Sequence, residues 1–173
     1  MGFSVSASAA IIFISFLMVA GTLYTAWDNA YARVQAAQED WYSLRLNQLN
    51  TLSSLNAELS SLRNTTTYYN LTLAIQNNGV TTYVPHWNGV FDGRVVTLYN
   101  ISDDNVGFLS DYTYLLPGEN ALLNVTHIPL NENPHTLNVV FGNGCWIMFD
   151  WYYNTTTNTV HIVISRGCPT EVR

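Results

Sequence analysis

The chain has 173 residues, of which 48% are hydrophobic and only 10% are charged, a composition too apolar for an intrinsically disordered protein. Twelve acidic residues, six arginines and no lysine give a net charge of −6. A negative chain without a basic patch is not expected to bind nucleic acid, because such binding depends on neutralising phosphates.

The first 27 residues contain no Asp, Glu, Lys or Arg. A helix from Ser8 to Trp27 would rise about 30 Å, which is roughly the hydrocarbon thickness of a bilayer. Tyr24 and Trp27 stand at its end, where aromatic rings favour the membrane boundary. We therefore expect residues 1–27 to form a retained transmembrane anchor. The alternatives are a cleaved secretory signal, which needs a basic region before the apolar run, and a buried core helix.

Residues 28–63 contain no proline and no glycine and are rich in residues that favour a helix. Leucines toward the end of this stretch recur at helical spacing, at Leu52, Leu55, Leu59 and Leu62. The pattern predicts a helix that continues to Arg63 within a helical connector over residues 28–66. Its leucine stripe would pack either in a coiled coil of several copies or on the chain's own next domain.

From residue 67 onward the hydrophobic period changes to two, which is typical of strands. Turn signals separate short apolar runs, at Asn77-Asn78-Gly79, Asp92-Gly93 and Asn143-Gly144. We expect a strand over Val80–Val84, and another over residues 120–128 with Leu123, Val125 and His127 on one face. Roughly seven to nine such strands predict an immunoglobulin-like β-sandwich over residues 67–173.

The predicted fold class is therefore α+β: a long N-terminal helix, transmembrane and then extended, followed by an immunoglobulin-like β-sandwich. Length alone suggests one folded domain besides the anchor.

The last two strands suggest their own pairing. If Cys145 lies opposite Cys168, the register aligns apolar pairs on one face, namely Phe149 with Ile164, Trp151 with Ile162 and Tyr153 with Val160. This register predicts a disulfide between the two cysteines, worth about 3 kcal/mol in chain-entropy models. The alternative is a pair of buried free thiols, which is less typical of an exported domain.

Five Asn-x-Ser/Thr sequons make candidate N-glycosylation sites of Asn64, Asn70, Asn100, Asn124 and Asn154. Glycosylation and a disulfide both belong outside the cytoplasm. We therefore expect a single-pass protein of the cell membrane, with a cytoplasmic N-terminus and an extracytoplasmic C-terminal domain.

A catalytic constellation is not evident in the sequence. His86, His127, His135 and His161 have no metal-ligand spacing among themselves or with the two cysteines. The Gly-x-Ser-x-Gly and P-loop motifs are also absent. We expect a protein that is not an enzyme and that holds no metal or cofactor.

The opening of the chain resembles that of the FlaF/ArlF family of the archaeal motility structure, the archaellum. The likeness rests on Met1-Gly2-Phe3-Ser4-Val5-Ser6 and Gly21-Thr22-Leu23-Tyr24-Thr25. It implies a stator or anchor of the archaellum motor, whose sandwich binds the S-layer protein as a dimer and has a FlaG-like partner.

Gly2 followed by Phe3, a Ser/Ala run and an apolar helix also resembles the class III signal of archaeal pilins and archaellins. A prepilin peptidase cuts such signals after the glycine, which makes Gly2 and Phe3 the candidate cleavage site. This resemblance implies a different function. The chain would be an archaellin-like or type IV pilin-like filament subunit, with its N-terminal helices packed in the core of a helical assembly.

Overall fold

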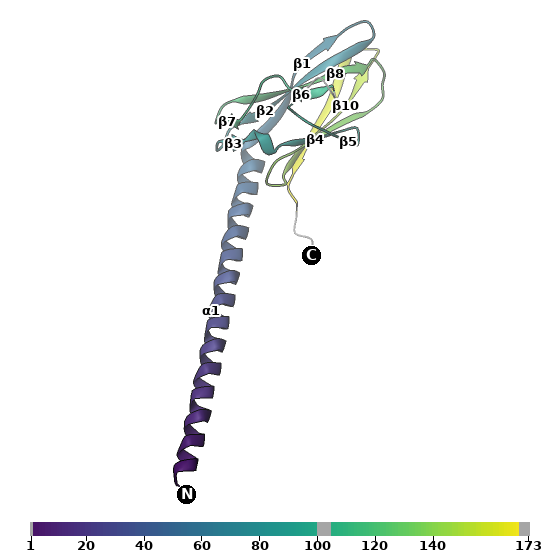
Figure 1. The fold of residues 1–173 in the computed structure, drawn as a ribbon. Coiled ribbons are helices and arrows are strands. Elements are labelled where there is room, and N and C mark those ends of the chain that lie inside the picture. The colour runs from purple at the N-terminus through teal and green to yellow at the C-terminus, as the bar shows by residue number, and fades with distance from the viewer. Residues whose placement is uncertain (1, 100–104, 170–173) are drawn as a thin grey trace. The chain divides into compact units, whose positions relative to one another are not determined.

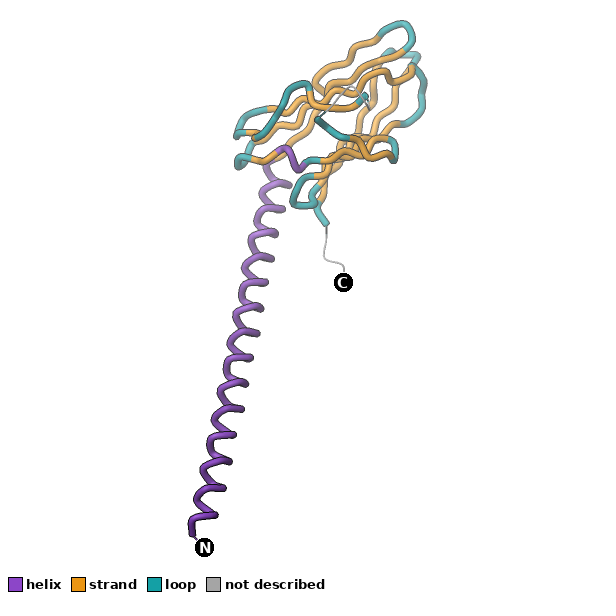
Figure 2. Tube along the Cα trace, viewed as in Figure 1, coloured by secondary structure: helices purple, strands orange, loops and turns teal. Residues whose placement is uncertain are grey.

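The computed structural model describes residues 2–99 and 105–169. The chain divides into two compact units, residues 1–45 and 46–173. The elements follow one another as α1 (Gly2–Ser54), β1 (Leu55–Asn64), β2 (Tyr68–Asn77), β3 (Thr82–Tyr83), the 3-10 turn η1 (Val84–His86), β4 (Asn88–Phe91), β5 (Arg94–Val96), β6 (Val106–Phe108), β7 (Tyr114–Leu115), β8 (Asn120–Pro129), β9 (His135–Val140), β10 (Trp146–Asn154) and β11 (Thr159–Gly167) (Figure 1). After α1 the described chain consists of strands, loops and this one short turn (Figure 2).

The first unit contains α1 as far as Arg45. Every side chain from Ala7 to Leu44 is exposed. The apolar part of this helix is long enough, and free enough of charge, to cross a membrane. A long, apolar N-terminal helix is therefore confirmed, and its length and composition suit either a lipid or a protein environment.

The helix ends earlier than the leucine spacing predicts. It stops at Ser54, and residues 55–64 form β1, which pairs antiparallel with β2. The predicted helix to Arg63 is therefore wrong, and the predicted connector over residues 28–66 is helical only to Ser54.

A β-bulge explains the misleading spacing. The register of β1 against β2 shifts between Leu59 and Ser61, so that Ser60 is an extra residue. Leu55, Ala57 and Leu59 point inward before the bulge, and Leu62 points inward after it. The bulge makes the step from Leu59 to Leu62 three residues long, whereas Leu55 and Leu59 are four residues apart. Steps of four and three residues are also the spacing of one face of a helix.

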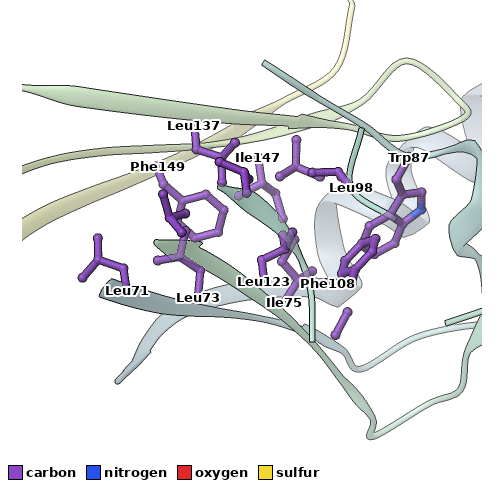
Figure 3. Close-up of a cluster of buried hydrophobic side chains, with 14 of the residues drawn as sticks. Leu71, Leu73, Ile75, Trp87, Leu98, Phe108, Leu123, Leu137, Ile147 and Phe149 are labelled. Atoms are coloured by element: carbon purple, nitrogen blue, oxygen red, sulfur yellow. The ribbon is translucent and has the colours of Figure 1, made fainter. Parts of the chain in front are cut away.

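The second unit is built on two antiparallel sheets, in the orders β1-β2-β8-β6 and β11-β10-β9-β4-β5, with a small β3-β7 pair. The core lies between the two larger sheets (Figure 3). Leu71, Leu73 and Leu123 come from the first sheet, and Leu137 and Phe149 come from the second. The predicted helix followed by a sandwich of antiparallel sheets is therefore confirmed.

The closing hairpin has the register that the sequence predicts. Phe149 pairs with Ile164, Trp151 with Ile162 and Tyr153 with Val160. The β10 members of these pairs are buried in the core. The hairpin was predictable because strict alternation over nine residues of β10 leaves one register that buries the aromatic side chains.

Two predicted strands differ in detail. His127 has a φ of 58° and is exposed, and the register of β8 against β2 shifts at this point, so Ile128 rather than His127 points inward. Of Val80–Val84 only Thr82–Tyr83 forms a strand, because η1 with its proline begins directly afterwards.

A buried polar pair links the sheets across the core. The indole Nε1 of Trp151 donates a hydrogen bond of 3.1 Å to the hydroxyl of Tyr69. The ring of Tyr69 also stacks on that of Tyr153 at 4.9 Å. Burial raises the pKa of Tyr69 above the usual 10.0, because it disfavours the charged phenolate.

We expect alkaline pH to destabilise the sandwich through Tyr69. Since its folded pKa is raised, its contribution is complete below pH 10.0 and is lost as pH rises through the folded value. Tyr69→Phe should lower the free energy of unfolding at neutral pH by about 1–3 kcal/mol, because it leaves the Trp151 N–H unpaired. The variant should also show a shallower decline above pH 10 than the wild type. Denaturant unfolding at several pH values measures both effects, and equal alkaline slopes in the two proteins would contradict the assignment.

Candidate assembly surfaces

The exposed face of α1 carries an apolar stripe. Residues at alternating steps of four and three share one face of a helix. In α1 these positions are Phe13, Leu17, Ala20, Tyr24, Trp27, Tyr31, Val34, Gln38 and Trp41. Trp27 is 76% exposed and Tyr31 is 64% exposed. Exposed apolar side chains in such a row are expected to be covered by lipid or by protein.

The stripe continues beyond the uncharged segment. Asp28 is the first charge, yet Trp41 lies on the same stripe about 20 Å further along the axis than Trp27. The charges of this part, at Asp28, Arg33, Glu39 and Asp40, fall on the other half of the helix circumference. Arg45 is on the stripe, where its guanidinium lies 5.9 Å from the ring centroid of Trp41. The helix is therefore amphipathic from Asp28 to Arg45.

The last turns of α1 belong to the second unit and are joined to the sandwich by a polar network. Gln48 is only 6% exposed, and its Nε2 donates to the carbonyl oxygen of Asn143 at 3.2 Å. Asn143 Nδ2 donates to Asn47 Oδ1 at 3.2 Å and to Thr51 Oγ1 at 2.7 Å. Its Oδ1 accepts a hydrogen bond from the backbone N–H of Cys145 at 3.1 Å. The Asn143 side chain thus connects two turns of helix to the start of β10.

A disulfide lies against the same helical turn. The structure joins Cys145, which is buried, to Cys168. The two sulfur atoms lie 3.9 and 3.7 Å from the carbonyl oxygen of Gln48. The disulfide therefore holds the end of β11 to the start of β10 at the point where the helix meets the sandwich.

The turn after β2 receives the end of the helix. The backbone N–H of Asn78 donates to the carbonyl of Ser54 at 2.9 Å. A Cβ on Gly79 would collide with the Ser54 side chain, so only glycine fits there without a shift. Asn77 is fully buried, and its Nδ2 donates to the carbonyls of Val80 and Leu115. The predicted turn at Asn77-Asn78-Gly79 is confirmed, and it also contacts the last residue of α1.

The sequons are spread over the sandwich. Asn64 ends β1 and donates to the Tyr153 hydroxyl at 3.1 Å. Asn70 and Asn124 are half-buried on the outer face of the four-stranded sheet. Asn154 ends β10, where its Oδ1 accepts from the N–H groups of the following turn. Asn100 lies outside the described residues.

The predicted cleavage site lies at the start of the helix, where Gly2 and Phe3 fall in the first turn of α1. Among residues 2–99 and 105–169, no group of three His, Cys, Asp or Glu side chains could hold a metal ion. His135 Nδ1 and Asp92 Oδ2 lie 2.7 Å apart. This pair fixes the β4–β5 turn to β9, because Asp92 Oδ1 also accepts from the Thr136 N–H.

The network around Asn143 was not predicted. The sequence marks Asn143-Gly144 only as a turn, and Gln48 reads as one polar residue among many in the helix. Their contact joins segments 95 residues apart, so no local pattern signals it.

The model of the archaeal-type flagellin family matches residues 2–173, which includes both the helix and the sandwich. The chain belongs to the archaeal-type flagellin family. The predicted relation to the archaellum is therefore confirmed, and the family is a structural component of the archaellum rather than an enzyme. The finer assignment to FlaF/ArlF stays a prediction.

Solved archaellum structures resemble this archaeal-type flagellin. "The archaeal flagellum of Methanospirillum hungatei strain JF1" is 18% identical, with a TM-score of 0.60 over 90% of this chain and 98% of that chain. At this identity the likeness shows the fold alone.

Two further structures come from Sulfolobus acidocaldarius. The archaellum periplasmic stator protein FlaG is 20% identical, with a TM-score of 0.41 over 56% of this chain and 98% of that chain. The complex of the stator proteins FlaF and FlaG is 20% identical, with a TM-score of 0.41 over 54% of this chain and 86% of that chain. No curated protein matches this sequence.

We expect Asn143→Ala to loosen the joint between helix and sandwich. The change removes the side-chain hydrogen bonds to Asn47, Thr51 and the Cys145 N–H. It should lower the free energy of unfolding of the detergent-solubilised flagellin by about 1–3 kcal/mol. Asn120→Ala is the matched control, because Asn120 is exposed at the start of β8. Thermal unfolding followed by tryptophan fluorescence measures the difference, and equal stability of both variants would disprove the role of Asn143.

Proposed function

We propose that this chain is a filament subunit of the archaellum, with the α1 helices of many copies packed on one another in the filament core. The observation that carries the proposal is the family match over residues 2–173, because it takes in the apolar helix together with the sandwich. A subunit of a helical filament needs both an interface that buries apolar surface and a folded domain that stays in water.

The stripe on α1 supports packing against protein. Lipid would cover the uncharged segment up to Trp27, but it would leave Tyr31, Val34 and Trp41 in water. Burying side chains of this size is worth about 1.5–3 kcal/mol each. Since the stripe follows a spacing of four and three residues, helices of neighbouring copies are suitable partners for it.

The membrane belongs to the same proposal as an earlier stage. Before assembly, residues 1–27 would anchor the subunit in the cell membrane, with a cytoplasmic N-terminus and the sandwich outside the cell. Cleavage between Gly2 and Phe3 by a prepilin peptidase would precede assembly. The sequons Asn64, Asn70, Asn100, Asn124 and Asn154 would carry glycans on the outside.

A stator that binds the S-layer protein, with a FlaG-like partner, is the alternative implied by the opening residues. A stator would be much less abundant than a filament subunit, because each filament contains many copies of its subunit. It also differs in the use of the helix, since a stator needs its helix only as an anchor.

A charge on the stripe outside the uncharged segment separates the two functions. We expect Trp41→Asp to abolish assembly, because a carboxylate buried among packed helices without a partner costs several kcal/mol. Membrane insertion should be unchanged, because residue 41 lies well beyond the uncharged segment that ends at Trp27. Ser43→Asp is the matched control on the polar side of the helix, and cells carrying it should form filaments.

The measurement is mass spectrometry of filaments sheared from cells, together with the amount of the chain in their membranes. The proposal requires this flagellin to be the major filament protein in the wild type and in the Ser43 variant. If the filaments consist of another protein and both variants behave as the wild type, the stator function is correct instead.

A further inference from the structure

The described sequons, at Asn64, Asn70, Asn124 and Asn154, differ in what their side chains do in the folded sandwich. N-glycosylation joins a glycan to the Nδ2 atom of an asparagine within an Asn-x-Ser/Thr sequence. An acceptor in a folded domain therefore needs a free Nδ2 and a free hydroxyl two residues later. Its segment must also be able to leave the surface and enter the active site of a transferase.

The sequon at the end of β10 meets all of these conditions. Asn154 Oδ1 accepts hydrogen bonds from the backbone N–H groups of Thr156 and Thr157, at 2.9 and 3.1 Å. This turn of the side chain onto the backbone leaves Nδ2 on the opposite side of the amide, where it donates to no residue in the described chain. The Thr156 hydroxyl likewise has no hydrogen-bond partner among residues 2–99 and 105–169. Residues 155–158 form an exposed turn between β10 and β11.

Asn64 lies at the same end of the sandwich, but its Nδ2 is in use. It donates a hydrogen bond of 3.1 Å to the hydroxyl of Tyr153. That hydroxyl has a single hydrogen, which it donates to Asn158 Oδ1 at 3.0 Å, so it can only accept from Asn64. Tyr153 is 2% exposed and cannot follow Asn64 outward. A transferase would therefore have to break this bond before it could reach Nδ2.

The other two sequons are in inner strands. β2 lies between β1 and β8, and β8 lies between β2 and β6. The hydroxyl of each sequon is also engaged, since Thr72 Oγ1 donates to Asn124 Oδ1 at 3.4 Å and Thr126 Oγ1 donates to the carbonyl of Asn105 at 3.2 Å. To enter an active site, Asn70 or Asn124 would have to leave the ladders on both sides of its strand. Inner strands open in this way only at free energies close to that of global unfolding.

We propose that the folded sandwich is the substrate of N-glycosylation and that Asn154 is the principal acceptor among the described sequons. The partner is a transferase that uses a glycan linked through phosphate to a lipid. Asn154 Nδ2 forms a bond to the anomeric carbon, the bond from that carbon to the phosphate oxygen breaks, and the lipid phosphate leaves. Nδ2 gives up one of its two protons to water. This inference rests on the export of the sandwich in the proposed function, and it narrows the choice of sequon.

The position of Asn154 keeps a glycan away from the end of the helix. Cys145 lies at the start of β10, beside the contact between Gln48 and Asn143. Nine residues of extended strand separate Cys145 from Asn154, a distance of about 30 Å. A glycan on Asn154 would therefore leave the attachment of α1 to the sandwich uncovered.

The occupancy of each sequon tests the inference. It is measured by mass spectrometry of glycopeptides from the full-length chain, purified from the cells that make it. Occupancy at Asn154 should be roughly ten times that at Asn64, Asn70 or Asn124, or more. Equal occupancy at the four sites would show transfer to an unfolded chain and would overturn the inference, as would an Asn154 without glycan.

Thr156→Ala should abolish the glycan on Asn154. The change removes the hydroxyl of the sequon but keeps the turn, because Asn154 bonds to the backbone N–H of residue 156. Thr157→Ala is the matched control in the same turn, since residue 157 is outside the sequon. Equal loss of glycan in both variants would contradict the assignment.

Tyr153→Phe should create an acceptor, because it frees Asn64 Nδ2 from its hydrogen bond. Occupancy at Asn64 should rise, whereas occupancy at Asn70 should stay low because the sheet remains folded. Tyr152→Phe is the matched control, because the neighbouring Tyr152 is exposed and does not bond to Asn64. If Asn64 stays empty in the Tyr153 variant, the hydrogen bond is not what withholds it, and the proposed selection by the fold is wrong.

The same preparations separate this inference from the proposed function. A chain that is the major filament protein but lacks a glycan on Asn154 overturns the inference alone. A chain that carries the glycan on Asn154 but is absent from filaments supports the inference and overturns the proposed function.

Discussion

The long helix α1 exposes an apolar surface that the rest of the chain leaves uncovered. From Ala7 to Leu44 the chain itself covers none of this helix, although its stripe holds tryptophan, tyrosine and aliphatic side chains. An isolated helix of this kind is not stable in water, because nothing removes its apolar area from solvent. The chain therefore needs an environment that lies outside itself. The uncharged segment is suited to a bilayer, and the proposed function assigns the part from Asp28 to Arg45 to the helices of other copies.

The sandwich binds the end of the helix. Residues 46–54 form part of the sandwich unit, and hydrogen bonds of Gln48 and Thr51 with Asn143 join them to it. Gln48, Asn143 and the disulfide lie together at this joint. The disulfide stays within the sandwich, so hydrogen bonds of defined geometry hold the end of the helix to it.

The sequence predicted the features that depend on local alternation, and it failed where tertiary contacts decide. The β10–β11 register follows from one buried face, so Phe149, Trp151 and Tyr153 were placed correctly. The helix end was wrong because a bulge at Ser60 gives a strand the spacing of a helix. His127 was misplaced because a second bulge inverts the alternation of β8. The Gln48–Asn143 contact could not be predicted, because the two residues are 95 positions apart and no local sequence pattern links them.

In the proposed filament, copies of this chain cover one another's α1 stripe. A helical reconstruction of purified filaments, at a resolution that shows aromatic side chains, would show this packing. We expect α1 helices in the core, with Trp27, Tyr31 and Trp41 of each copy in contact with the helices of its neighbours. A core built from another protein, or an arrangement in which Tyr31 and Trp41 face water, would contradict it.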